Sequence, residues 1–316
     1  MGNLIAKVAP NSDLSTDLLP PSSKFKPERD IPDLSGKIVL VTGGNAGIGY
    51  HTVKHLLLKN AKVYLAGRSR EKGTAAVERL EQETGGKTAI FIQLDLADLA
   101  SVRRAATEFL ALESRLDVLF NNGGVMVTPT KELTVQNYDL QFGTNVIGHF
   151  FFTELLLPAL MASHKTNQVP ARIISTSSSA HKLALTGIDF VSLKGGSERD
   201  ARLYGESKLG NILYSNHLAK AYPGVIVSCA LHPGSVRTDL QKNLPGWMQV
   251  MLDLTLPPAP MGAYTQLWAG TTAPHGQIDG QYLIPWARLG RADPIAASKQ
   301  LEEEIIAYLR EQVRGF

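Results

Sequence analysis

Short apolar runs and amphipathic stretches alternate along most of the chain. Residues 38–41 are uniformly apolar, and a glycine-rich turn separates them from an amphipathic stretch over about 48–60. An apolar run of this length is typical of a buried strand, and apolar positions three to four residues apart predict a helix. The first unit is therefore a strand, a loop and a helix.

The same unit recurs toward the C-terminal end. Further strands are predicted at 62–66, 89–94, 118–120, 173–176 and 225–231, with a last edge strand at 281–284. Helices are predicted from about 70, over 99–112 and 135–161, around Tyr204, and over 261–271 and 294–314. Strands alternating with helices of this length indicate right-handed βαβ units. We therefore predict an α/β fold with a doubly wound, Rossmann-type parallel sheet of about seven strands.

Two segments depart from this alternation. Residues 1–34 contain several prolines among polar residues, which predicts an extended arm before a single domain over 35–316. The segment at about 241–260 contains Trp247 and Met251 between prolines, and we interpret it as a cap over a substrate pocket. Contact with a membrane surface is the alternative, which one apolar helical face of this length supports only weakly.

Composition narrows the class of protein. With 44% hydrophobic and 19% charged residues the chain is not a disordered one. Its net charge of +3, without a Lys/Arg run, argues against a nucleic-acid partner. The single cysteine, Cys229, excludes an internal disulfide and fits a reducing, cytoplasmic location. No signal-peptide core and no uninterrupted run of about 18 apolar residues occur, so no integral membrane segment is expected.

The histidines show neither an H-E-x-x-H spacing nor a neighbouring cysteine cluster. These are the patterns in which protein-bound zinc is usually held. No metal is therefore expected. The sequence leaves open whether the chain forms a homo-oligomer.

The stretch Thr42-Gly-Gly-Asn-Ala-Gly-Ile-Gly49 lies between the first predicted strand and helix. Glycines there let the backbone approach a pyrophosphate, and the helix N-terminus attracts its charge. The spacing of Gly43, Gly47 and Gly49 differs from G-x-G-x-x-G. In this position the stretch predicts a dinucleotide-binding loop, and a tight turn that packs helix on strand is the alternative.

The second strand ends in Ala66-Gly-Arg-Ser-Arg70, with no acidic residue before Glu71. An NAD-binding unit usually offers a carboxylate to the ribose at this place. Arg68 is instead placed to bind a 2′-phosphate, and Arg70 or Lys72 adds positive charge. The sequence therefore favours NADP(H) over NAD(H).

Tyr204-Gly-Glu-Ser-Lys208 places a phenol and an ammonium four residues apart. On a helix both lie on one face. A nearby ammonium is expected to lower the pKa of the phenol from about 10, so that it exchanges protons near neutral pH. Taken alone, such a pair is commonly two long side chains that cover a surface.

Four motifs, in this order, resemble those of the short-chain dehydrogenase/reductase family over roughly residues 35–290. They are T-G-x-x-x-G-x-G at 42–49, N-N-A-G at 121–124, Y-x-x-x-K at 204–208 and the P-G segment at 232–238. Gly124 stands where the family usually has Ala, a change expected to loosen the turn slightly. Segments 67–73, 178–181 and 232–234 look most like the branch with retinol dehydrogenases and WW-domain-containing oxidoreductases.

The resemblance implies a role for each matching residue. Tyr204 is the general acid/base, and Lys208 binds the nicotinamide ribose and lowers the phenol's pKa. Ser178 polarises the substrate carbonyl, with Ser177 as the fallback, and Asn145 anchors a water in the proton relay. The positions implied to contact the cofactor are Gly43, Asn45, Gly47, Ile48, Gly49, Asp95, Asn122, Val236 and Thr238, although Asp95 also fits a helix cap.

These features together predict an NADP(H)-dependent oxidoreductase. It would transfer hydride between the nicotinamide and a moderately apolar aldehyde, ketone or secondary alcohol. Two alternatives use the same fold: a non-catalytic NADP(H)-binding sensor or scaffold, and an NADP-using lyase or epimerase. The identity of the substrate does not follow from the fold.

Overall fold

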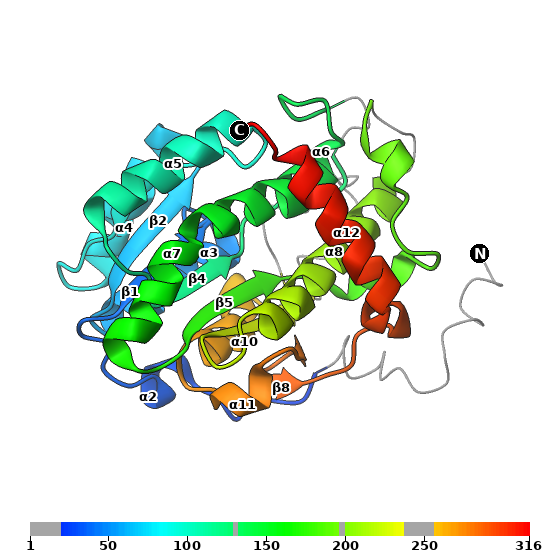
Figure 1. Cartoon of the computed structure of the whole chain (residues 1–316). Coiled ribbons are helices and arrows are strands. Elements are labelled where there is room, and N and C mark those ends of the chain that lie inside the picture. The colour runs from blue at the N-terminus through cyan, green and yellow to red at the C-terminus, as the bar shows by residue number, and fades with distance from the viewer. Residues whose placement is uncertain (1–19, 129–131, 196–199, 237–255) are drawn as a thin grey trace.

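The apolar runs pair into one eight-stranded sheet with the order β3-β2-β1-β4-β5-β6-β7-β8 (Figure 1). The computed structural model describes residues 20–128, 132–195, 200–236 and 256–316. The strands are β1 (Ile38–Thr42), β2 (Lys62–Gly67), β3 (Ile90–Gln93), β4 (Val118–Asn121), β5 (Ala171–Thr176), β6 (Ile226–Leu231), β7 (Tyr282–Ile284) and β8 (Arg288–Leu289). All neighbours pair in parallel except β8, which is antiparallel to β7.

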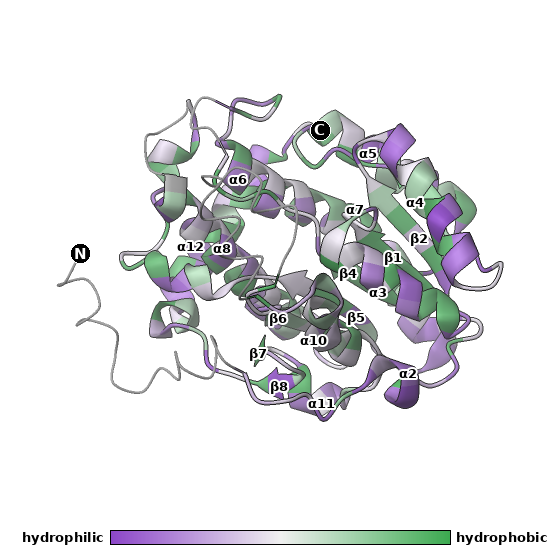
Figure 2. Cartoon of the chain, turned by 180° about the vertical axis from the view of Figure 1, so that it is seen from behind, coloured by the Kyte–Doolittle hydropathy of each residue, from purple (hydrophilic) through white to green (hydrophobic). Residues whose placement is uncertain are grey.

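Helices cover both faces of the sheet (Figures 1 and 2). One face carries α5 (Leu99–Leu112), α7 (His149–Asn167), α8 (Asp200–Ala221) and α12 (Lys299–Gln312). The other carries α3 (Gly47–Leu58), α4 (Arg70–Glu83), α10 (Ala259–Thr271) and α11 (His275–Ile278). Shorter elements are α2 (Pro27–Asp30), α6 (Leu140–Phe142), the π-helical turn η2 (Gly143–Gly148) and the 3₁₀ turns η3 (Ser179–Leu183), η4 (Phe190–Leu193) and η6 (Pro294–Ala297).

Burial on both faces explains why the strands are continuously apolar. Every residue of β1, β4 and β6 is buried, as expected of a parallel sheet between two helical layers. Successive side chains point to opposite faces. Leu40 therefore belongs to the core under α5 and α7, whereas Val41 belongs to the core under α3 and α10. The predicted doubly wound fold is confirmed.

The strand order reverses between β1 and β4. β1 pairs with β2 on one side and with β4 on the other, and the chain runs outward from this point in both directions. Loops at the carboxyl ends of β1 and β4 therefore leave the sheet toward opposite helical layers. Such a switch point opens a crevice in which ligands of doubly wound sheets bind.

Two predicted boundaries were wrong. The helix expected at 135–161 begins at Leu140 and continues to Asn167. Asp139 caps its start by accepting a hydrogen bond from the Phe142 N–H at 2.8 Å. Asn137, with φ +61°, lies in a preceding turn. The strand at 281–284 is not the edge of the sheet, because β8 follows it; two residues are too few to carry a periodic signal.

The helical run Leu140–Asn167 has the length and composition of a membrane-spanning helix. In this fold, 72% of its most apolar 18-residue window is buried. The run packs against α5 and β5 in the core. Its apolar character is thus accounted for by its central position in the domain.

Residues 20–34 lie against the domain. Phe25, Ile31 and Leu34 are buried in the core under α3 and α10, and the Leu34 N–H donates to the Lys59 carbonyl oxygen at 2.7 Å. Residues 1–19 of the predicted arm and 241–255 of the predicted cap lie outside the described residues.

Gly270 offers a test of how closely α10 packs on the sheet. A Cβ at this position would lie 2.2 Å from Cζ of the buried Phe120. Gly270→Ala should therefore destabilise the protein by about 1–3 kcal/mol, since overpacking displaces neighbouring side chains. Thermal unfolding measures the effect. Gly276→Ala in α11 is the matched control, because its Cβ would meet no atom within 4 Å; equal losses of Tm would contradict the packing argument.

Candidate active site

Two glycine-rich loops meet at the switch point and are joined through Thr42, the last residue of β1. The Thr42 Oγ1 accepts hydrogen bonds from the N–H groups of Asn122 and Gly123, each at 2.9 Å. The Asn122 Nδ2 donates to the Thr42 carbonyl oxygen at 2.8 Å. The loop after β1 and the loop after β4 therefore form one structure.

Glycine is required where these loops approach each other. A Cβ on Gly49 would lie 2.3 Å from the Gly43 carbonyl oxygen, and one on Gly43 would lie 2.8 Å from the Gly123 Cα. Gly43 also has a positive φ of +64°, a conformation that side chains disfavour. The crowding leaves a cradle lined by backbone.

The N-terminus of α3 opens onto this cradle. Ala46 precedes the helix and supplies no side-chain cap, so first-turn N–H groups, among them those of Ile48 and Gly49, lack an intrahelical partner. Such a terminus attracts anions. The cradle and the uncapped helix together would suit the pyrophosphate of a dinucleotide, and they contain Gly43, Gly47, Ile48 and Gly49, whose contact with the cofactor stays a prediction.

Three basic side chains, those of Arg68, Arg70 and Lys72, are exposed at the end of β2 and the start of α4. Among the described residues, no carboxylate lies within ion-pair distance of any of them. The Asn45 Oδ1 lies beside this strand end, 2.9 Å from where a Cβ on Gly67 would be. The end of β2 and the start of α4 therefore carry three basic side chains and one acidic side chain, Glu71, with no close ion pair among the described residues.

Asp95 stabilises a turn rather than capping α5. Its Oδ1 accepts a hydrogen bond from the Ala97 N–H at 3.0 Å, whereas the helix cap is Asp98, which accepts from the Ala100 N–H at 3.0 Å. Of the residues predicted near the nicotinamide, Val236 is buried beside Gly262 of α10. Thr238 lies outside the described residues.

Tyr204 and Lys208 lie on the face of α8 that turns toward the carboxyl end of β5. Both are buried, and the Lys208 Nζ lies 5.5 Å from the centroid of the Tyr204 ring. The Nζ donates to the Thr176 carbonyl oxygen at 3.1 Å, and Asn211 Nδ2 donates to the same oxygen at 3.1 Å. The end of β5 thus fixes the lysine beside the phenol.

The expected fall in the phenol's pKa does not occur in this structure. Burial raises the pKa of Tyr204 to about 12, and the nearby Ser178 hydroxyl offsets part of that rise. Burial also lowers the pKa of Lys208 to about 8. The prediction of a phenol that titrates near neutrality was wrong here because desolvation disfavours the charged form of both groups.

The two candidate serines have different partners. Ser177 is buried, and its hydroxyl donates to the Lys208 carbonyl oxygen at 2.7 Å. Ser178 is half-buried and begins η3 by accepting from the Ala180 N–H at 3.1 Å, and its hydroxyl lies near enough to Tyr204 to lower the pKa of the phenol. Ser178 is therefore the serine that meets the phenol, whereas Ser177 joins β5 to α8.

Asn145 lies in the π-helical turn η2 and is fully buried. Its Oδ1 accepts from the Val125 N–H at 2.9 Å, and its Nδ2 donates to the Val125 carbonyl oxygen and the Ser207 Oγ, each at 3.0 Å. Ser207 in turn donates to the Tyr204 carbonyl oxygen at 2.8 Å. This chain of contacts connects Asn145 with the helix that carries the phenol.

Gly124 has a more specific role than the sequence suggested. A Cβ at this position would lie 2.8 Å from the Asn145 Oδ1 and 3.6 Å from the Lys208 Nζ. Glycine therefore makes room for the Asn145 amide, which its three hydrogen bonds hold in place. The motif N-N-A-G at 121–124 has its Ala at position 123, so the comparison of Gly124 with that Ala was wrong, and Gly124 matches the glycine of the motif.

The sequence reasoning missed Ser207 and Asn211. Both follow Tyr204 at helical spacing, three and seven residues later, on the face that carries Lys208. That spacing was the available signal. It did not show that their side chains bind other elements of the site.

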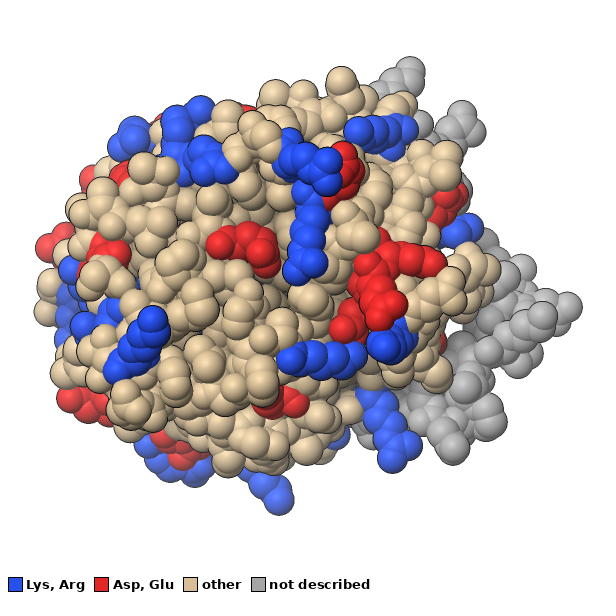
Figure 3. All heavy atoms as spheres, viewed as in Figure 1, with Lys and Arg blue, Asp and Glu red and all other residues tan. Residues whose placement is uncertain are grey.

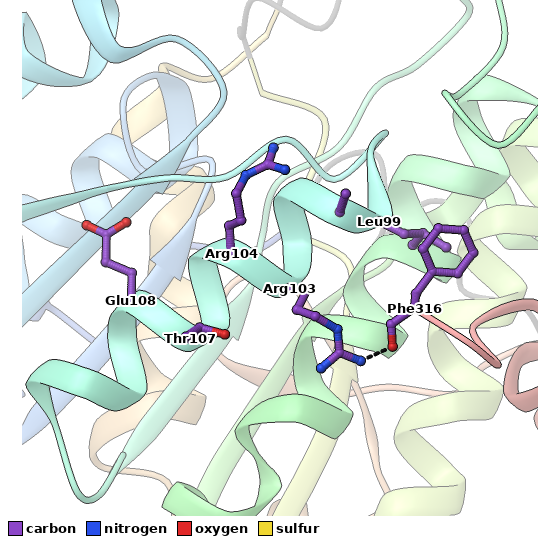
Figure 4. Close-up of a pocket in the computed structure, with 7 residues that line it drawn as sticks. Leu99, Arg103, Arg104, Thr107, Glu108 and Phe316 are labelled. Carbon is purple, nitrogen blue, oxygen red and sulfur yellow. Dashed lines mark hydrogen bonds between the residues drawn. The ribbon is translucent and has the colours of Figure 1, made fainter.

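A hollow of about 700 Å³ in the described structure lies away from this site (Figure 4). In it, Arg103 of α5 donates a hydrogen bond to the carbonyl oxygen of Phe316. Its lining residues are Leu99, Ala100, Arg103, Arg104, Thr107, Glu108 and Phe316. None of these belongs to the predicted site, so this hollow is not the crevice beside Tyr204.

On the face seen in Figure 3, positively and negatively charged side chains are interspersed, so this face shows no second candidate binding site for a charged ligand. Among the described residues, no group of three or more His, Cys, Asp and Glu side chains is arranged to hold a metal ion.

The chain is similar to proteins of known family. A model described as short chain dehydrogenase matches residues 37–249. A short-chain dehydrogenase/reductase from Armillaria gallica is 52% identical over 299 residues, covering 92% of this chain and 95% of that protein. Human retinol dehydrogenase 11 is 38% identical over 243 residues, covering 76% of this chain and 74% of its own.

A solved structure shares the fold. RhlG from Pseudomonas aeruginosa, in an active-site complex with NADP, superposes with a TM-score of 0.65 at 25% identity, covering 81% of this chain and 96% of its own. The eight-stranded sheet and the glycine loop of this chain agree with these similarities. The chain belongs to the short-chain dehydrogenase/reductase family, on the branch that includes the retinol dehydrogenases.

Proposed function

We propose that this protein is an NADP(H)-dependent oxidoreductase acting on a moderately apolar aldehyde, ketone or secondary alcohol. The observation that carries the proposal is the arrangement of Tyr204, Lys208, Ser178 and Asn145 around one end of the sheet. Family membership supports an oxidoreductase. We further propose that the segment at about 241–260 caps the substrate and that the protein works in the cytoplasm.

The bound nicotinamide would supply or accept the hydride. Tyr204 would donate its phenolic proton to the carbonyl oxygen during reduction and remove a proton from the alcohol during oxidation. Ser178, whose hydroxyl lies near Tyr204, would donate to the same oxygen and stabilise its developing negative charge. Lys208 would hold the cofactor ribose and favour the phenolate, opposing the effect of burial.

The cofactor would be held by the cradle after β1 and by the basic end of β2. Gly43, Gly47 and Gly49 admit the pyrophosphate to the start of α3. Arg68 is exposed there without a carboxylate partner among the described residues, and it suits a 2′-phosphate. The NADP complex of the Pseudomonas aeruginosa protein supports this choice.

Replacing the phenol tests the reaction. Tyr204→Phe should lower kcat for NADPH-dependent reduction of a panel of small carbonyls by about 100-fold or more, because proton transfer is lost. Tyr214→Phe is the matched control on the same helix; its hydroxyl binds Glu154 at 2.9 Å, so Tm should fall while turnover persists. Product mass distinguishes reduction, which adds two hydrogens, from a lyase or epimerase reaction. Unchanged turnover in Tyr204→Phe would contradict the assignment.

The lowered pKa of Lys208 predicts the pH above which activity falls. Burial lowers its pKa to about 8, so the ammonium loses its proton as the pH rises through that value. The kcat/KM for reduction should therefore fall about tenfold per pH unit above pH 8. A pH–rate profile with NADPH measures this, and a flat profile from pH 7 to pH 10 would contradict the role of the ammonium.

The stability effect of Lys208 has the opposite sign. Its pKa in the unfolded chain is near 10.5, so the unfolded state binds the proton more tightly than the folded state. The cost of burying this charge is present below about pH 8 and is relieved as the pH rises toward 10.5. Titration of Lys208 should thus not lower Tm over this range. A Tm that falls in parallel with activity would indicate unfolding instead.

Replacing Arg68 tests the cofactor preference. Arg68→Ala should raise the KM for NADPH about tenfold or more and leave the KM for NADH nearly unchanged, because only NADPH carries the 2′-phosphate. Arg104→Ala on α5, which removes another exposed guanidinium, is the control. An undiminished preference for NADPH in Arg68→Ala would show that Arg68 is not the residue that reads the phosphate.

A further inference from the structure

We propose that His149 is a positioning residue. It would couple the cofactor loop, by which we mean Thr42 and the loop residues Asn122 and Gly123 bound to it, to the π-helical turn that carries Asn145. His149 begins α7 and is buried at 3% exposure. Its Nε2 lies 2.8 Å from the Thr42 Oγ1, and its Nδ1 lies 3.0 Å from the Asn145 carbonyl oxygen. One imidazole therefore joins the end of β1 to η2.

The partners determine which ring nitrogen carries the proton. A carbonyl oxygen can only accept, so the His149 Nδ1 donates to Asn145. In the neutral ring the Nε2 is then an acceptor, and the Thr42 hydroxyl donates to it. Burial lowers the pKa of His149 to about 4, which is consistent with a neutral ring.

The orientation of the Thr42 hydroxyl follows. Its oxygen already accepts the Asn122 and Gly123 N–H groups at 2.9 Å each. Its one proton has two acceptors within reach, the His149 Nε2 at 2.8 Å and the Phe120 carbonyl oxygen at 3.2 Å. The shorter contact to an unprotonated nitrogen directs the proton to His149. The hydrogen bonds therefore run in one direction, from the cofactor loop through Thr42 and His149 to Asn145.

The hydrogen-bond network ends at the Asn145 carbonyl oxygen, which lies in the π-helical turn η2. In the π-helical turn at Gly143–Gly148, the hydrogen-bond ladder departs from the α-helical pattern. The His149 Nδ1 satisfies the Asn145 carbonyl there, while the Asn145 side chain holds Val125 and Ser207. We infer that this clamp holds the Asn145 backbone so that its amide reaches both partners.

Two substitutions of His149 each keep one of its two hydrogen bonds and remove the other; we call them half-mimics. The amide of His149→Asn can replace the Nδ1 donor but falls short of Thr42. The amide oxygen of His149→Gln can replace the Nε2 acceptor, but its geometry leaves the Asn145 carbonyl without the ring donor. His149→Phe removes both contacts. His164→Gln, at the other end of α7 and outside the network, is the matched control.

Amide hydrogen exchange measures the effect at the Thr42 end and at the Asn145 end of the network, and it does not require enzymatic turnover. His149→Asn should speed exchange of the Asn122 and Gly123 N–H groups about tenfold and spare Val125, because only the Thr42 contact is lost. His149→Gln should speed exchange of the Val125 N–H about tenfold and spare the other two. His149→Phe should affect all three amides, and His164→Gln none.

Steady-state kinetics provide a second measurement, which rests on the proposed function. His149→Asn should raise the Kd for NADPH about tenfold with a smaller change in kcat, and His149→Gln should lower kcat about tenfold with little change in Kd. Identical exchange patterns in the two half-mimics, or unchanged exchange in all three His149 variants, would overturn the proposal. A wild-type protein without turnover would count against the proposed function alone, because the exchange measurement remains interpretable.

Discussion

The site depends on the hydrogen-bonded closure of the switch point through the Thr42 side chain. Parallel strands leave their carboxyl ends unpaired at one edge of the sheet, and the loops that leave β1 and β4 diverge there. The Thr42 hydroxyl compensates by accepting two N–H groups from the second loop. The closeness of the loops then admits only glycine at Gly43 and Gly49. The cradle and its exposed helix N-terminus follow from this constraint.

Main-chain carbonyls, rather than ion pairs, hold the side chains of Lys208 and Ser177 in place among the described residues. The Thr176 carbonyl receives both Lys208 and Asn211, and the Lys208 carbonyl receives Ser177. These contacts join the end of β5 to the middle of α8. Main-chain acceptors carry no net charge, so they orient the ammonium without neutralising it. The lysine keeps its positive charge available for groups in the crevice, at the cost of a pKa lowered by burial.

The buried phenol and ammonium show why proximity alone does not decide protonation. Their spacing suggested mutual stabilisation of the charged forms. Desolvation instead raises the pKa of Tyr204 and lowers that of Lys208, which favours the neutral form of each. A cofactor phosphate or ribose that contacts Lys208 would change this balance. The fold thus supplies the geometry of the pair, and occupancy of the crevice would set its charge.

Local patterns in the sequence determined the elements and the broad chemistry. Hydrophobic periodicity identified the strands and most helices, because burial between two layers imposes it on each segment. The glycine loop and the spacing of Tyr204 and Lys208 were equally local. Tertiary structure decided what depends on distant partners: the contact of Ser177 with the Lys208 carbonyl, the need for Gly124 beside Asn145, and the contacts of His149. The choice of Ser178 over Ser177 had already followed from the family resemblance. A sequence shows which groups can form hydrogen bonds, but only the packed fold shows which partner each group meets and how far water is excluded.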